Sequence, residues 1–150
     1  MKFIHRLTLL MLFSLAIPIS AQPDSTSDLF LAAGHGETNT VRGLLNQGAS
    51  ANAKDEQGIA VLMFAVKFGH TDTVKLLLER GADPNLTAMG GYTPLMFAAV
   101  YGDAEMVQAL LAKGARVNDK SKDGETALVL AQDAGKSDNA NMLKRYGVRN

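Results

Sequence analysis

The sequence repeats itself with a period of 33 residues, and this period constrains the fold more than any other feature. Four ladders of residues recur at that interval: Leu29, Leu62, Leu95 and Leu128; Ala32, Ala65, Ala98 and Ala131; Gly36, Gly69, Gly102 and Gly135; and Gly48, Gly81, Gly114 and Gly147. A shorter ladder consists of Asn52, Asn85 and Asn118. A period of this size is typical of a solenoid, in which stacked units bury one continuous core.

The unit over residues 88–120 shows the expected local structure most clearly. Thr93 can cap a helix whose first residue is Pro94, and Gly102 can end that helix. Asp103 can cap a second helix, whose apolar residues share one face: Met106, Val107, Leu110 and Leu111. A polar, glycine-containing stretch with turn chemistry follows. We therefore predict an all-α solenoid of about four stacked helix-turn-helix units with short β-turn or hairpin connections.

Several motifs in these units resemble the ankyrin repeat. The matches are Thr93-Pro94-Leu95 to Thr-Pro-Leu, Gly81-Ala82-Asp83-Pro84-Asn85 to Gly-Ala-Asp-x-Asn, and Gly69-His70 to the Gly-His before the second helix. The resemblance covers roughly 24–148. It implies an N-terminal linker at 22–27 and an ankyrin-repeat domain at 28–150, with repeats at about 28–54, 55–87, 88–120 and 121–150.

The chain departs from the ankyrin pattern at a few positions. The family's His after Thr-Pro-Leu is replaced by Met63, Met96 and Val129, so we expect stacking to rely on packing and not on that His's hydrogen bonds. In the second unit Ala60 replaces the capping Thr, which predicts a first helix without a side-chain cap. Lys144 stands where earlier units have leucine, as expected of a polar end cap.

Residues 1–21 have the three parts of a signal peptide. Lys2 and Arg6 precede an apolar run over residues 7–17, and Pro18 and small residues lead to a predicted cleavage site after Ala21. A membrane anchor is the alternative, but a spanning helix needs about 20 apolar residues. We therefore predict a periplasmic or secreted protein with no stable membrane anchor after cleavage, resembling exported bacterial ankyrin-repeat proteins.

Charge and motifs argue against nucleic-acid binding and against catalysis. Lys plus Arg and Asp plus Glu each number 15, so no strong field favours a polyanion, and cysteine is absent. After cleavage, histidine is limited to His35 and His70, without metal-ligand spacing. The calcium-loop-like stretch at 119–124 has Leu130 where the loop's final Glu would stand. We predict no enzyme activity, no cofactor and no metal site.

The ankyrin resemblance implies a binding surface on the turn tips and on the concave face of the first helices. The candidate residues there are Ile59, Phe68, Met89, Tyr92, Val100 and Tyr101. Phe68 or Val100 could instead fill a gap between stacked helices. Tyr92 and Tyr101 are the preferred candidates, because a phenol suits a surface that is wet when free and dry when bound.

These observations predict a non-catalytic, protein-binding module that is monomeric on its own and binds another protein. Within that class, the chain could be an inhibitor or immunity-type protein for a periplasmic hydrolase, or an accessory to an oxidative-stress enzyme. A secreted host-directed effector is a different class. Because the fold does not determine the function, these alternatives stay open.

Overall fold

The 33-residue period of the sequence becomes a period of helix starts. The computed structural model describes residues 25–147. The first helices of the repeats are α1 (Ser25–His35), α3 (Val61–Lys67), α5 (Pro94–Tyr101) and α7 (Ala127–Asp133). The second helices are α2 (Thr38–Asn46), α4 (Thr71–Glu79), α6 (Ala104–Ala112) and α8 (Ser137–Gly147). Apart from α1, each set starts at 33-residue intervals, which confirms the predicted all-α solenoid.

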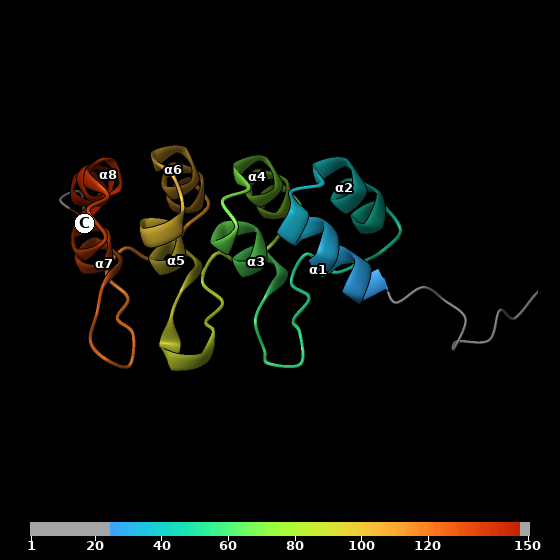
Figure 1. Cartoon of the computed structure of the whole chain (residues 1–150), viewed down its shortest axis with the longest axis horizontal. Helices are drawn as coiled ribbons and strands as arrows, with labels where there is room; N and C mark the ends of the chain where they lie inside the picture. Colours follow the sequence, from blue (N-terminus) through green and yellow to red (C-terminus); the bar gives the residue numbers. More distant parts are fainter. Residues whose placement is uncertain (1–24, 148–150) are drawn as a thin grey trace, which may run out of the picture.

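The helices form two layers (Figure 1), with the first helices in one and the second helices in the other. Each helix contacts its partner within the repeat and its equivalents in the adjacent repeats. Three turns project beyond the layer of first helices, and we call them finger 1 (53–60), finger 2 (86–93) and finger 3 (119–126). Finger 2 contains a short 3-10 helix, Met89–Gly91.

Each finger is closed by the same backbone hydrogen bond, again at 33-residue intervals. The donors and acceptors are Asp55 N to Ile59 O at 3.0 Å, Ala88 N to Tyr92 O at 2.9 Å, and Ser121 N to Glu125 O at 2.9 Å. The predicted hairpin-like connections are therefore present.

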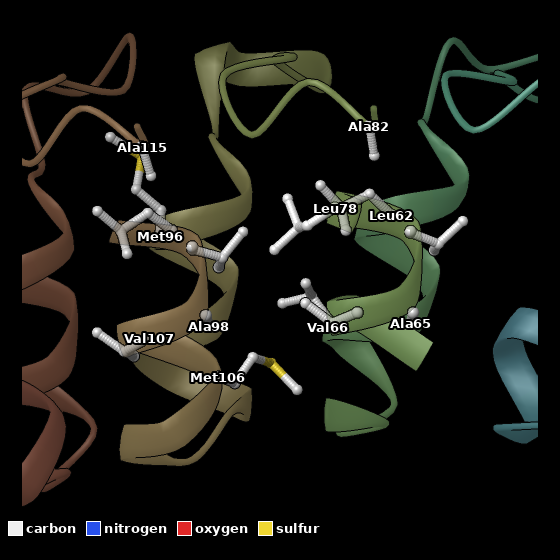
Figure 2. Close-up of a cluster of buried hydrophobic side chains, with 14 of the residues drawn as sticks. Leu62, Ala65, Val66, Leu78, Ala82, Met96, Ala98, Met106, Val107 and Ala115 are labelled. Carbon is white, nitrogen blue, oxygen red and sulfur yellow. The ribbon is translucent and has the colours of Figure 1, made fainter. Parts of the chain in front are cut away.

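The core lies between the repeats and depends on small residues. Ala65, Ala98 and Ala131 are fully buried and Ala32 is 3% exposed, so neighbouring first helices can approach closely. Larger side chains, including Leu62, Val66, Met96 and Met106, fill the space between the helices of the second and third repeats (Figure 2). Because each repeat packs against the repeats next to it, the repeats stabilise one another.

The predicted helix caps are confirmed. Thr93 Oγ1 accepts a hydrogen bond from Met96 N at 3.3 Å, and Asp103 Oδ1 accepts one from Met106 N at 2.7 Å. Ala60 precedes α3 without a side-chain cap, as predicted. Finger 1 provides a partial substitute, since Val61 N donates to Ala53 O at 2.9 Å.

The N-terminal boundary differs from the prediction. Helix α1 begins at Ser25, although the start positions of α3, α5 and α7 correspond to residue 28 in the first repeat. The linker predicted at 22–27 therefore overlaps an additional turn of helix. The signal peptide predicted at 1–21 lies outside the described residues and stays a prediction. Within residues 25–147, no helix combines the length and hydrophobicity needed to cross a membrane.

Asparagine side chains bridge the repeats in addition to the packed core, a contribution that was not predicted from the sequence. Asn52 donates to Gly81 O at 3.1 Å and accepts from Asp83 N at 2.7 Å. Asn85 repeats this arrangement, donating to Gly114 O at 3.0 Å and accepting from Arg116 N at 2.9 Å. Each amide therefore connects its own repeat to the next one.

The C-terminal end of the stack is polar, in agreement with its predicted role as an end cap. Lys144 is exposed on α8, whereas Leu78 and Leu111 at the equivalent positions of the inner repeats are buried. A charged residue is tolerated there because no further described repeat packs on α8.

Candidate protein-binding groove

A groove of about 940 Å³ lies among α1, α3 and finger 1. Its apolar lining comes from the two helices: Phe30, Leu31, Phe64 and Phe68. Its polar rim is the tip of finger 1, residues 54–57. The concave face of the first two repeats is therefore hollow and largely apolar.

Aromatic contacts hold the apolar lining in place. The rings of Phe30 and Phe64 meet edge to face with centroids 5.0 Å apart, and the ring of Phe68 lies 6.4 Å from that of Phe64. Gly34 lies beside the Phe68 ring, and a Cβ at that position would make ordinary van der Waals contact with the ring at 3.7 Å. Leu31 is 61% exposed and Phe68 is 54% exposed, so these two side chains are accessible to a partner.

The rim of the groove is preorganised by one carboxylate. Asp55 Oδ1 accepts hydrogen bonds from the backbone N–H groups of Gln57, at 3.0 Å, and Ile59, at 2.8 Å. The Asp55 side chain therefore stabilises the turn, while Lys54 and Glu56 beside it are exposed. The rim thus carries one accessible charge of each sign.

A second aromatic cluster lies on α5 and finger 2. The ring of Phe97 contacts Tyr92 edge to face, with centroids 6.2 Å apart, and stacks on Tyr101, with centroids 6.1 Å apart. Tyr101 is 52% exposed, and Met89 at the tip of finger 2 is 81% exposed. This cluster is also an apolar surface that remains accessible to a partner.

Tyr92 connects fingers 2 and 3. Its hydroxyl donates a hydrogen bond to Glu125 Oε2 at 2.7 Å, and this bond raises the pKa of Tyr92 because ionisation would remove the donor. Beside it, Lys122 N donates to Gly90 O at 2.8 Å. The two fingers are therefore held together. The Tyr92 hydroxyl, which was predicted to contact a partner protein, is already hydrogen-bonded to Glu125 within the chain.

The hydrogen bond of Tyr92 predicts a pH dependence. The bond stabilises the folded chain fully below about pH 10, where tyrosine in the unfolded chain begins to ionise. This contribution is lost as the pH rises through the higher pKa of the folded state. We expect Tyr92→Phe to lower the free energy of unfolding at neutral pH and to make its decline at alkaline pH shallower.

Denaturant titrations of the wild type and Tyr92→Phe across that pH range would test this expectation. Tyr101→Phe is the matched control, since the Tyr101 hydroxyl makes no side-chain hydrogen bond within residues 25–147. Equal alkaline slopes for the wild type and Tyr92→Phe would contradict the role of Glu125.

The predicted site residues divide between these two surfaces. Phe68 lies in the groove, whereas Tyr92 and Tyr101 belong to the second cluster, and Ile59 and Val100 are half-buried. Met89 is exposed, as a binding residue must be. Whether any of the six binds a partner stays a prediction.

Sequence reasoning missed the floor of the groove and the centre of the second cluster. The missed residues are Phe30, Leu31, Phe64 and Phe97. A signal was present, because Leu31, Phe64, Phe97 and Leu130 form a further 33-residue ladder of large apolar residues. Unlike the buried ladder that includes Leu62 and Leu95, this ladder places Leu31 and Phe64 in the lining of the groove.

The two histidines have the environments of structural residues. His70 Nε2 lies 2.8 Å from Gly34 O, which connects the first two repeats. His35 is exposed, with Nδ1 3.9 Å from Glu37 Oε1. Across residues 25–147, no three His, Cys, Asp or Glu side chains are grouped closely enough to hold a metal ion.

Comparison with known protein families supports the architecture. Residues 8–88 and 86–150 match the family described as ankyrin repeats (3 copies). No curated protein matches the chain significantly. Ankyrin repeats generally act as protein–protein interaction modules, and proteins built from them are generally non-catalytic. The repeated helix pairs together with this match show that the chain belongs to the ankyrin-repeat family.

Proposed function

We propose that this chain is a non-catalytic module that binds another protein outside the cytoplasm. The observation that carries this proposal is the apolar groove of about 940 Å³, with Leu31 and Phe68 exposed at its surface. Large apolar side chains gathered on a concave surface are typical of interaction sites, and aromatic residues often dominate the binding energy.

The geometry of the concave face favours a preformed binding surface. Fingers 2 and 3 are joined through Tyr92 and Glu125, and finger 1 is braced by Asp55. A surface that is already ordered loses little conformational entropy when a partner binds, so more of the contact energy appears as affinity. The groove and the Tyr101 cluster lie on this same face and are proposed to form one docking surface.

Location outside the cytoplasm rests on the predicted signal peptide. Lys2, Arg6 and the apolar run at 7–17 support recognition by an export machinery, and Ala21 supports cleavage. N-terminal sequencing of the protein recovered from cell fractions tests this directly. We expect a mature N-terminus at Gln22 in the periplasm or the medium; an intact N-terminus in the cytoplasm would contradict export.

The binding surface is tested with a double variant. Immobilised chain 22–150 is expected to capture a specific protein from a periplasmic extract, and Phe68→Ala with Tyr101→Ala is expected to weaken capture at least about tenfold. Both side chains are about half exposed, so their removal leaves the buried core intact. Affinity for the purified partner, measured by calorimetry, gives the magnitude.

A variant on the opposite layer is the matched control. Gln108 is exposed on α6, and Gln108→Ala is expected to bind the partner as the wild type does. Equal affinity of the double variant and the wild type would show that the partner binds elsewhere. An activity assay of the captured protein then separates inhibition from assistance, and sedimentation of the chain alone tests the expected monomer.

A further inference from the structure

The first repeat lacks a feature that the other three share in the described chain. A finger leads into each of α3, α5 and α7, whereas α1 itself includes an extra helical turn, residues 25–27 (Figure 1). The consequence appears in the ladder of large apolar residues on the first helices. Leu31 is 61% exposed, while its equivalents Phe64, Phe97 and Leu130 are at least partly buried.

The third repeat shows what covers this position when a finger is present. Tyr92, at the end of finger 2, places its ring edge-on against Phe97 with centroids 6.2 Å apart. Phe97 stands 66 residues after Leu31, two full periods along the ladder. The chain itself therefore demonstrates that an aromatic side chain on a finger is a suitable cover for this site.

Finger 1 is the first finger among the described residues, and one side of it faces the groove. Lys122 N on finger 3 donates to Gly90 O on the preceding finger at 2.8 Å. Glu56 holds the position of Lys122 in finger 1 and lines the groove, and among residues 25–147 its N–H has no acceptor, as is also true of Met89 at the same position of finger 2. A hydrogen-bond donor and an uncovered apolar side chain thus meet at the same place.

We propose that the groove binds a turn-forming segment of the partner protein, which occupies the place ahead of α1 where the described residues contain no finger. The segment seats an aromatic or branched aliphatic side chain on Leu31 and offers a backbone carbonyl to Glu56 N–H. This inference rests on the proposed function and names the chemistry of the partner.

Two other occupants fit less well. If the chain is cleaved at the proposed site, only Gln22, Pro23 and Asp24 remain ahead of α1, which is fewer residues than a finger has. A second copy stacked end to end would present its C-terminal repeat, whose exposed side chains are mostly polar, Lys136, Asn141 and Lys144 among them, with Val129 as an apolar exception. Those polar residues would leave the apolar groove without an apolar cover, so a different protein is the better occupant.

The test uses a phage-displayed library of disulfide-closed peptide loops of the same length as finger 1, selected on the chain 22–150. We expect the enriched loops to carry an aromatic or branched aliphatic residue beside Gly, Asn or Pro, because these residues form turns. Purified loops should bind Leu31→Asp at least about tenfold more weakly than the wild type. Because Leu31 is 61% exposed, this variant should fold normally, which circular dichroism verifies.

Val129→Asp is the matched control, since Val129 is also apolar, 42% exposed and on a first helix, but lies in the last repeat. Loops that bind Leu31→Asp and the wild type equally, or the absence of enriched loops, would overturn the inference. Loop binding by chain 22–150 but not by chain 1–150 would also overturn the inference, because it would assign the groove to the chain's own N-terminal segment. Dimerisation of the chain that Leu31→Asp abolishes would overturn it as well, because a second copy would then occupy the groove.

The two proposals can fail separately. If the partner binds the wild type and Leu31→Asp equally but loses affinity for the Phe68 and Tyr101 double variant, the proposed function stands and the missing-finger inference falls. If chain 22–150 captures no protein, the proposed function fails, whether or not the selected loops bind the groove.

Discussion

Replacing Gly36 with alanine is expected to lower the free energy of unfolding by about 2–4 kcal/mol. Gly36 has a φ of 71°, and a Cβ at this position would lie 2.4 Å from Nδ1 of His70. The imidazole cannot move away freely, because its Nε2 is within hydrogen-bonding distance, 2.8 Å, of Gly34 O. The substitution therefore combines an unfavourable backbone conformation with a clash between the first two repeats.

Gly135 provides the matched control for this prediction. It belongs to the same ladder and has a φ of 70°, but a Cβ there would meet no atom within 4 Å. Gly135→Ala should therefore lose only the backbone contribution, about 1–2 kcal/mol. Urea denaturation of both variants measures the difference. Equal losses would mean that the contact with His70 contributes nothing.

Replacing Asn139 with alanine is expected to destabilise the last repeat by about 2–3 kcal/mol. Asn139 is 2% exposed, and its Nδ2 donates to three carbonyl oxygens where α5 ends: those of Ala98, Ala99 and Gly102, at 3.3, 3.1 and 3.2 Å. Carbonyls at a helix C-terminus lack partners within the helix. Ala98 O also accepts from Gly102 N at 2.9 Å, whereas the amide satisfies the carbonyls of Ala99 and Gly102, which burial would otherwise leave unpaired. It also attaches α8 to the preceding repeat.

Hydrogen exchange followed by mass spectrometry would locate this effect. Because each repeat of a solenoid depends on its neighbours, Asn139→Ala should increase exchange in α7 and α8 before it affects α3 and α4. Asn141→Ala is the control, since Asn141 is exposed on the same helix and its loss should change stability little. Uniform acceleration across the chain would contradict a local attachment.

The arrangement of the helices could be predicted because it depends on local chemistry. Thr93 and Asp103 cap helices through bonds to a residue three positions further on. Because the 33-residue ladders place equivalent residues in every repeat, each repeat predicts the same pair of helices. The start of α1 was the exception. Its register predicted residue 28, yet the helix continues back to Ser25, where no finger is present among the described residues to end it.

The candidate site was predicted less completely, because it depends on contacts between repeats. Tyr92 was correctly placed on a finger, but its bond to Glu125 joins residues 33 positions apart and could not be read from either residue alone. Phe68 was predicted as part of one stripe with Tyr101. Phe68 and Tyr101 stand one 33-residue period apart, and each ring contacts a phenylalanine of its own repeat. The contact that the sequence could not show is the one between Phe30 and Phe64, because it joins two repeats.

The period and the caps by themselves determined that this chain forms a stack of helix pairs, since both act within one unit or between identical units. Only the tertiary structure decided where the stack is left open. The extra turn of α1, the exposure of Leu31 and the groove beside finger 1 lie at the first of the described repeats, where the period gives no described neighbour from which to predict them.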